Sequence, residues 1–224
     1  MATTEPSSQP TAPPGLAEAI GGPLGVAESA LPAAAFVAAS TASGGDTTLA
    51  AIVAVGLALL LTLARLARGQ TVQYALSGLI GVAFAAFIAA RTGKAENFFL
   101  PGLLANAAYG SVFAVSIVVR RPIVGYLTMV LHGHPPTGPW REDSVFVKAA
   151  TRASWVFVVV FLGRLAVQLP LYLADALVAL GVARVAMGLP LFALASWLAW
   201  LLLRGIPVPG GHAPATASGP PAAT

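Results

Sequence analysis

The 224-residue chain contains no cysteine. Without a thiol it cannot form a disulfide, bind a metal through thiolate ligands, or use a cysteine nucleophile. The absence leaves the cellular compartment open, because many proteins of oxidising and of reducing compartments lack cysteine.

Charged side chains are also scarce. They make up 9% of the residues, whereas hydrophobic residues make up 57%, and the mean hydropathy is +0.82. A soluble domain carries about 25% charged residues, with which it builds its hydrated surface. This chain has too few charges for such a surface, and the composition therefore predicts an integral membrane protein.

The small excess of basic residues, twelve Lys and Arg against eight Asp and Glu, does not indicate nucleic-acid binding. No basic stripe with interleaved aromatic residues is present. The basic residues instead lie beside apolar runs, as they do in membrane proteins that follow the positive-inside rule.

Apolar segments long enough to cross a bilayer recur along the chain. A hydrocarbon core of about 30 Å needs about 20 helical residues. Six segments meet this length, at residues 22–40, 47–66, 72–90, 98–119, 153–173 and 185–203, the last with an alternative start near Leu177. None shows the alternating polarity of a membrane β-strand. We expect an all-α, polytopic transmembrane bundle over residues 16–206, with about six spans; the first is the weakest, because Glu28 and Pro32 interrupt it.

Both ends of the chain lack apolar periodicity. Residues 1–15 and 207–224 are rich in Pro, Ala, Thr, Ser and Gly, and we expect them to be disordered tails. No Lys or Arg precedes Arg65, so the early apolar stretch lacks the basic flank of a signal peptide and is interpreted as part of a span.

The distribution of Lys and Arg predicts the orientation in the membrane. With the N-terminus in the cytoplasm, eight basic residues fall inside: Arg65, Arg68, Arg120, Arg121, Arg141, Lys148, Arg152 and Arg204. Three fall outside, namely Arg91, Lys94 and Arg184. Because the opposite orientation reverses this ratio, we expect both termini to be cytoplasmic in a multi-pass protein of the inner or plasma membrane.

The longest loop, residues 120–152, contains an apolar stretch that is too short to span. Ile123–Leu131 covers nine residues, against the roughly 20 that a span requires. We expect this stretch to form a short interfacial helix beside Arg120 and Arg121. Trp140 has the residue type and the basic neighbour, Arg141, that are typical of the headgroup region.

One basic residue lies near the middle of a predicted span. Arg164 is near the middle of residues 153–173, and Gln168 and Tyr172 follow on the same helical face. Charges inside a membrane are costly and are usually paired or functional. Glu28 is the expected acidic partner, and Asn106 and Tyr109 are expected polar neighbours. Two interpretations stay open: an Arg–Glu pair that fixes helix packing, or a polar pocket for an anionic ligand.

Other candidate chemistry is weak. His132 and His134 lie in a Gly- and Pro-containing loop with no adjacent carboxylate, whereas a metal site needs three or four ligands. No nucleophile with a base and an orienting acid can be assembled at helical spacing within the spans. We therefore expect no catalytic residues, no metal site, no cofactor and no enzymatic activity.

Several motifs resemble a known family. They are Thr92-Gly-Lys-Ala-Glu-Asn-Phe-Phe-Leu-Pro-Gly102, Asn106-Ala-Ala-Tyr-Gly110, Arg121-Pro122, Phe161-Leu-Gly-Arg164 with Gln168 and Leu171-Tyr172, Gly188-Leu-Pro-Leu191, and Leu31-Pro32 with Phe36. This pattern, over most of Leu16–Gly205, resembles the actinobacterial membrane family called domain of unknown function 3159. The resemblance implies a membrane protein but no defined activity.

A more distant resemblance is to the intracellular septation protein A family of the bacterial inner membrane. It rests on Arg121-Pro122-Ile123, on Trp140, and on a later span with Trp155 and Gly163. Arg164, directly after Gly163, departs from that pattern. The resemblance implies a role in the cell envelope.

Three functions follow as hypotheses. The first is a structural or interaction protein of the envelope, whose partners are the bilayer, other envelope membrane proteins or further copies of itself. The second is a small transporter, or a protein binding a lipid or another anionic ligand, with its site around Arg164. A membrane enzyme is the least favoured, because no catalytic set is visible.

Overall fold

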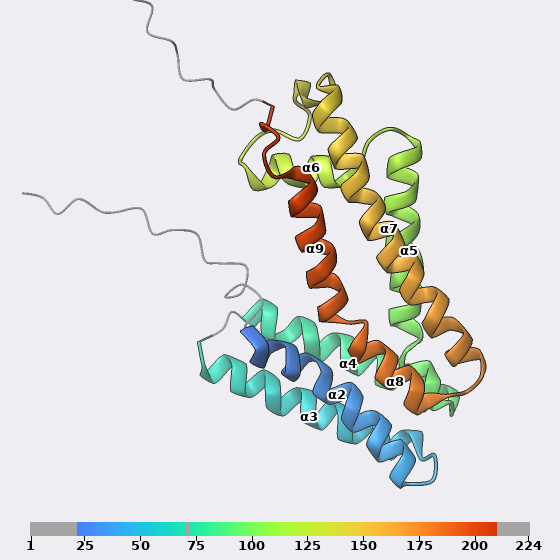
Figure 1. Ribbon diagram of the computed structural model, residues 1–224. Coiled ribbons are helices and arrows are strands. Elements are labelled where there is room, and N and C mark those ends of the chain that lie inside the picture. Colours follow the sequence, from blue (N-terminus) through green and yellow to red (C-terminus); the bar gives the residue numbers. More distant parts are fainter. Residues whose placement is uncertain (1–21, 70–71, 210–224) are drawn as a thin grey trace, which may run out of the picture. The chain divides into compact units, whose positions relative to one another are not determined.

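The computed structural model describes residues 22–69 and 72–209, without the side chains of residues 22–29, 74 and 75. Within this part of the chain every regular element is helical (Figure 1). The elements are α2 (Gly22–Ala42), α3 (Thr47–Ala67), α4 (Val72–Thr92), η1 (Ala95–Phe98), α5 (Leu100–Val118), α6 (Ile123–Leu131), η2 (Pro139–Arg141), α7 (Ser144–Leu173), α8 (Leu177–Ala186) and α9 (Leu189–Leu203). The predicted all-α class is confirmed. The predicted tail at residues 1–15 lies outside the described residues, as do residues 210–224 of the predicted tail 207–224. Residues 207–209 of that tail are described, and Val208 packs against the cluster of Met129, Trp140, Phe146 and Ala150.

The predicted spans fall on helical segments, and four of these segments are long and apolar enough to cross a bilayer. These are Thr47–Ala67, Leu100–Val118, Ser144–Leu173 and Leu177–Leu203. The helices α2 and α4 are each 21 residues long. Their apolar stretches with described side chains, residues 30–42 and 76–92, are shorter than the four candidate spans. Four candidate spans are thus established, and six crossings stay a prediction.

The helices form two compact units, the first ending at Ala95 and the second beginning at Glu96. In the first unit, α3 packs against both α2 and α4. Its packing surface is a stripe of small residues four apart, Ala50, Ala54, Ala58 and Thr62, all at most 8% exposed. Small side chains let helix backbones approach closely, which is how helices associate when lipid surrounds them.

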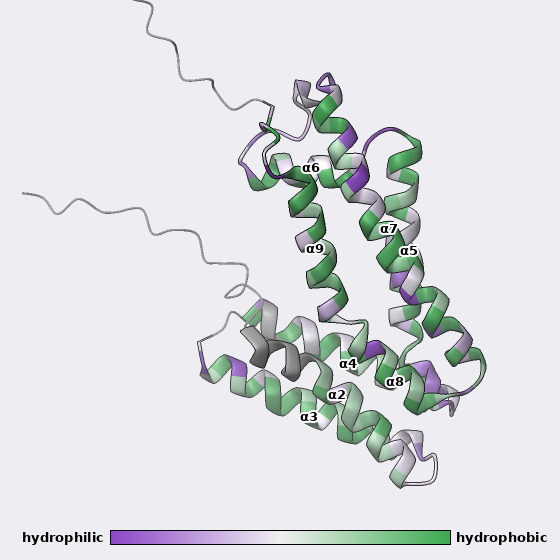
Figure 2. Ribbon diagram, viewed as in Figure 1, coloured by the Kyte–Doolittle hydropathy of each residue, from purple (hydrophilic) through white to green (hydrophobic). Residues whose placement is uncertain are grey.

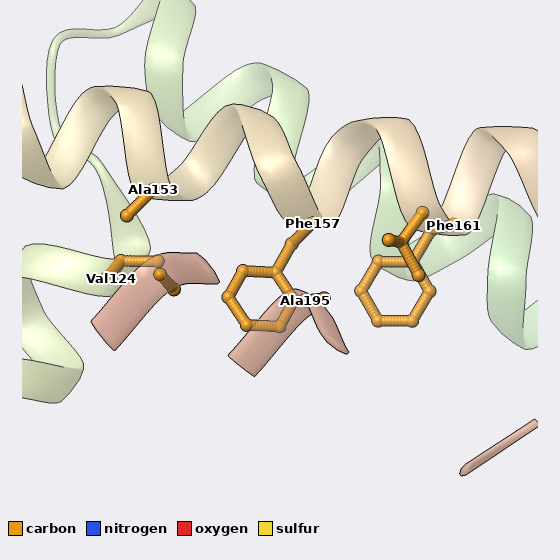
Figure 3. Close-up of a cluster of buried hydrophobic side chains, with 7 residues drawn as sticks. Val124, Ala153, Phe157, Phe161 and Ala195 are labelled. Carbon is orange, nitrogen blue, oxygen red and sulfur yellow. The ribbon is translucent and has the colours of Figure 1, made fainter. Parts of the chain in front are cut away.

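In the second unit, α7 is the central helix and contacts α5, α6, α8 and α9. Its aromatic side chains build the core, where Phe157 and Phe161 pack with Ala153, Val124 and Ala195 (Figure 3). The ring of Phe113 from α5 stacks on Phe157 with centroids 5.2 Å apart. Such offset aromatic pairs contribute about 1 kcal/mol beyond their buried area.

The start of α7 differs from the sequence prediction. The predicted span begins at residue 153, whereas α7 begins at Ser144. The Asp143 side chain caps it by accepting hydrogen bonds from the backbone N–H groups of Val145 and Phe146. At 30 residues, and thus about 45 Å, α7 is longer than the hydrocarbon core is thick. Its first turns, which carry Lys148 and Arg152, therefore extend beyond the apolar region that hydropathy detects.

The last predicted span, residues 185–203, is two helices with a break. The segment Leu177–Leu203 is interrupted after Ala186, and α9 starts at Leu189 with Pro190 in its first turn. Proline lacks a backbone N–H and is tolerated there. A Cβ atom at Gly188 would come within 3.0 Å of the Arg184 carbonyl oxygen, so the break needs glycine. Arg184 thereby lies within a candidate span instead of in the predicted outer loop.

The long helices consist mostly of hydrophobic residues (Figure 2). Large hydrophobic side chains are exposed on every long helix, among them Ile52 at 65%, Ile80 at 66%, Val112 at 55%, Val159 at 67% and Trp197 at 55%. A soluble monomer rarely exposes apolar patches of this extent. Together with the four candidate spans, this surface identifies a membrane protein.

Candidate functional site

Three of the predicted polar residues follow one face of α7. Arg164, Gln168 and Tyr172 are four residues apart, so they lie one above the other. Gln168 is only 1% exposed, and Arg164 and Tyr172 are partly buried. The rise along the helix from Arg164 to Tyr172, which is one residue before the end of α7, is about 12 Å. The face therefore runs from the end of the candidate span toward its middle.

Tyr172 connects this face to the segment before α5. Its hydroxyl donates a hydrogen bond of 2.5 Å to Oδ1 of Asn97 in η1, and Asn97 is 9% exposed. A hydrogen bond of this kind contributes about 1 kcal/mol. It joins the end of α7 to the segment directly before α5. Gly102 lies in the first turn of α5.

A second arginine reaches the start of α5 from α8. The guanidinium of Arg184 lies over the ring of Phe99, with 5.7 Å from Cζ to the centroid. It also occupies the space above Gly102, where a Cβ atom would overlap it. Glycine at position 102 is therefore what lets Arg184 approach the first turn of α5.

The two arginines are close enough for their charges to interact. Arg184 lies within electrostatic range of Arg164, and their mutual effect is repulsive. Within the described part of the chain, neither arginine has a carboxylate partner. The positive end of the α5 dipole adds to the same field, because α5 begins without a side-chain cap. Between α5, α7 and α8 the second unit thus has an uncompensated positive charge.

Buried polar atoms at this place lack hydrogen-bond partners. Among the described residues, Nε2 and Oε1 of Gln168 and Nε of Arg164 are buried and make no hydrogen bond. Leaving a buried polar group unpaired costs about 1–3 kcal/mol, and nearly all such groups in folded proteins are paired. The unpaired atoms therefore mark a place where a polar ligand group is expected.

The two predicted residues of α5 have different surroundings. Asn106 is 7% exposed and lies between Gly102 and Gly110 on one helical face. That face meets α7, because a Cβ atom at Gly110 would come within 2.9 Å of the Leu162 side chain. Tyr109 is 57% exposed, and its ring packs at a tilt against that of Phe161, with the ring centroids 5.5 Å apart. Asn106 lies on the α7-facing side of α5, whereas Tyr109 points mainly outward.

The predicted partner of Arg164 cannot be placed. Glu28 belongs to α2, and its side chain lies outside the described residues. The Glu28–Arg164 pair stays a prediction.

Sequence reasoning missed Arg184, Asn97, Phe99 and Gly102 as members of this cluster. Arg184 was assigned to the loop before a span starting at residue 185. The alternative start near Leu177, which the structure favours, places it within the span. The Asn97–Tyr172 contact joins residues 75 positions apart, and no local pattern indicates it.

The chemistry of this cluster is that of a receptor for negative charge. A guanidinium presents several N–H donors in a planar fork that matches carboxylate and phosphate oxygens, and an amide supplies one further donor group. Within the described residues no group of three metal-ligating side chains is present. His132 is exposed, with its Nδ1 2.8 Å from the Thr128 carbonyl oxygen, and it lies at the opposite end of the second unit.

No curated protein and no solved structure matches this chain. A family model described as "Protein of unknown function (DUF3159)" matches residues 20–208, which include every helix described above. The chain therefore belongs to the DUF3159 family of proteins of unknown function.

Proposed function

We propose that this protein is a non-enzymatic, six-span membrane protein that binds an anionic group between α5, α7 and α8. The ligand class is a phosphate or carboxylate, either free or carried by a lipid. The single observation that carries the proposal is the fully buried, unpaired Gln168 amide on the same helical face as Arg164, with Arg184 in electrostatic range.

The energetics support this function. Placing one arginine near the centre of a bilayer costs roughly 3 kcal/mol on insertion scales. Two arginines that repel each other, with an unpaired amide beside them, form an unfavourable arrangement in the empty state. An anionic group between them removes the repulsion and provides the missing acceptors. The unpaired amide and the repulsion between the arginines make the empty site unfavourable, and they favour binding of the anion for the same reason.

The proposed orientation has both termini in the cytoplasm of a bacterial inner membrane. Apart from Arg164 and Arg184, the positive-inside arrangement places eight basic residues inside and two, Arg91 and Lys94, outside. With this orientation the end of α7 near Tyr172 faces away from the cytoplasm. The anion site is then reached from the outer half of the bilayer.

A structural role in the cell envelope is the second candidate. The close crossing of α5 and α7 at Gly110 supports it, because Asn106 lies beside a tight helix contact of the kind that stabilises membrane bundles. In that case Arg164 pairs with Glu28, and the partners are other envelope proteins or a second copy of the chain. A distant relationship to intracellular septation protein A and an actinobacterial origin fit this role and remain predictions.

Thermal unfolding of Arg164→Leu separates the two functions. The measurement compares melting temperatures in detergent of wild type, Arg164→Leu and Glu28→Gln/Arg164→Leu, each with and without dodecyl phosphate. Dodecyl maltoside is the control for the dodecyl group without the anion, and inorganic phosphate is the control for the anion without the dodecyl group. A ligand at one hundred times its Kd stabilises the wild type by about 2.7 kcal/mol, which is roughly 5–10 °C for a chain of this size.

If the site binds an anion, Arg164→Leu folds at least as stably as wild type without ligand and loses the rise with dodecyl phosphate. A rise with inorganic phosphate as well identifies a free anion as sufficient, whereas a rise with dodecyl phosphate alone identifies an amphiphile. The proposal fails if neither phosphate raises the melting temperature of the wild type. It also fails if Arg164→Leu melts below the wild type and the added Glu28→Gln substitution restores the melting temperature.

A further inference from the structure

The short helix α6 presents an apolar face outward at one end of the second unit. Within that unit it lies across the ends of the longer helices (Figure 1). One side of α6 is buried, including Val124, Thr128 and Met129, and the N–H of Val124 donates to Ser154 Oγ on α7 at 3.3 Å. The other side exposes Leu127 at 50%, Val130 at 57% and Leu131 at 75%. A helix held in this way is suited to the boundary between headgroups and acyl chains.

Six exposed basic side chains lie on the segments next to α6: on the loops before and after it, on the first turns of α7 and at the end of α9. They are Arg120, Arg121, Arg141, Lys148, Arg152 and Arg204. The acidic residues at this end are Glu142 and Asp143, and the Asp143 carboxylate is used to cap α7. No other exposed Lys or Arg occurs in residues 96–209, so the positive surface of the second unit is concentrated here.

Arg141 is held in place instead of moving freely in solvent. It donates a hydrogen bond of 2.5 Å to the Tyr126 hydroxyl, and its Cζ lies 5.2 Å from the Tyr126 ring centroid and 5.6 Å from that of Trp140. Trp140, which the sequence placed among headgroups, is instead 1% exposed and packs beneath α6. The buried ring thus fixes an exposed guanidinium beside α6, which lowers the entropy cost of binding an anion.

Arg120 occupies a backbone conformation that favours glycine. Its φ is +56°, and it ends α5 with the two hydrogen bonds of a Schellman motif, from its own N–H to Ile117 and from Arg121 N–H to Ser116. Apart from Asp175, every other described residue with positive φ is glycine. The left-handed conformation costs an L-residue roughly 1–2 kcal/mol. A strained residue of this kind points to a function for its side chain.

We propose that α6 and the arginines on the segments next to it form a binding site for the headgroup of an anionic phospholipid. The guanidinium groups contact the headgroup phosphates, and Leu127, Val130 and Leu131 contact the upper acyl chains. Charge complementarity selects the occupant, because six exposed cations gather at the α6 end of the second unit with little local acidic compensation. This site is separate from the one around Arg164 and does not depend on it.

The test is native mass spectrometry of the full chain released from detergent with phosphatidylglycerol or phosphatidylcholine. Wild type is expected to retain phosphatidylglycerol in preference to phosphatidylcholine. A basic residue near a membrane surface contributes roughly fivefold in affinity. Arg120→Gly is expected to weaken phosphatidylglycerol binding by about this factor while its melting temperature stays equal or rises, because glycine relieves the strain. Arg120→Gly/Arg121→Gln/Arg152→Gln is expected to weaken binding on the order of a hundredfold.

Two matched variants serve as controls. Arg91→Gln removes an exposed cation from the first unit, and Gly102→Ala displaces Arg184 from the other site; both are expected to bind phosphatidylglycerol as wild type does. Equal retention of the two lipids by wild type, or undiminished binding by the triple variant, overturns the proposal. Loss of phosphatidylglycerol in Gly102→Ala alone also overturns it, by assigning the lipid to the site of Arg164 and Arg184.

Discussion

At the scale of single residues, Arg164, Arg184 and Gln168 determine what the second unit can bind. Each carries a polar group that would be better solvated in water, and each lies in an apolar stretch of its helix. Two guanidinium groups within electrostatic range need an anion between them or a carboxylate beside them. The described residues supply no such carboxylate. In the proposed function a bound ligand provides the negative charge, whereas in the structural alternative Glu28 provides it.

The position of Arg184 can be tested through Gly102. A methyl group in Gly102→Ala would overlap the Arg184 guanidinium, so the arginine must leave its place over Phe99. We expect the melting-temperature rise with dodecyl phosphate to shrink by at least half, because binding then weakens about tenfold or more. Gly163→Ala is the matched control, since it lies next to Arg164 with no atom within 4 Å of the added carbon. An equal response of the two variants would show that Arg184 takes no part in binding.

At the scale of secondary-structure elements, the sequence predicted the helices well and their ends less well. Ile123–Leu131 was expected as a short helix and is α6, because nine apolar residues beside charges leave few alternatives. The start of α7 was missed, since the Asp143 cap and the polar first turns lie outside the apolar run that hydropathy detects. The break at Gly188 depends on a close backbone approach, which is a three-dimensional property.

The packing of α6 on the Trp140 ring gives a prediction for this element. A Cβ atom at Gly125 would come within 2.8 Å of Trp140 Cζ3, in a region where Met129, Phe146 and Ala150 already fill the space. Gly125→Ala is expected to lower the free energy of unfolding by about 1–3 kcal/mol through overpacking. Thermal unfolding in detergent measures this, with Gly163→Ala as the control. A variant as stable as wild type would mean that the ring can move aside freely.

At the scale of the whole molecule, the second unit has one strongly basic end, and the long helices of both units expose large hydrophobic side chains. The exposed Lys and Arg residues of the second unit all lie at the end where α6 crosses. Composition alone was enough to predict the membrane class and most of this asymmetry. The site could be predicted only in part: Arg164, Gln168 and Tyr172 share a helical face that sequence reveals, whereas Arg184 and Asn97 reach it from other segments.

The orientation can be tested directly because the chain contains no cysteine. Thr48→Cys and Ser144→Cys each introduce a single thiol at an exposed position. On intact cells, a membrane-impermeant maleimide is expected to label Thr48→Cys, and to label Ser144→Cys only after permeabilisation. Labelling of Ser144→Cys on intact cells would reverse the proposed orientation.

The most direct test of the central claim is the melting temperature of Gln168→Met with and without dodecyl phosphate. Methionine has a similar shape and no amide to leave unpaired, so the empty variant is expected to be more stable than wild type by about 1 kcal/mol. It should at the same time lose most of the rise that dodecyl phosphate produces in wild type. A variant that melts below wild type, or that keeps the full rise with dodecyl phosphate, would contradict the claim that the Gln168 amide is kept unpaired for an anionic ligand.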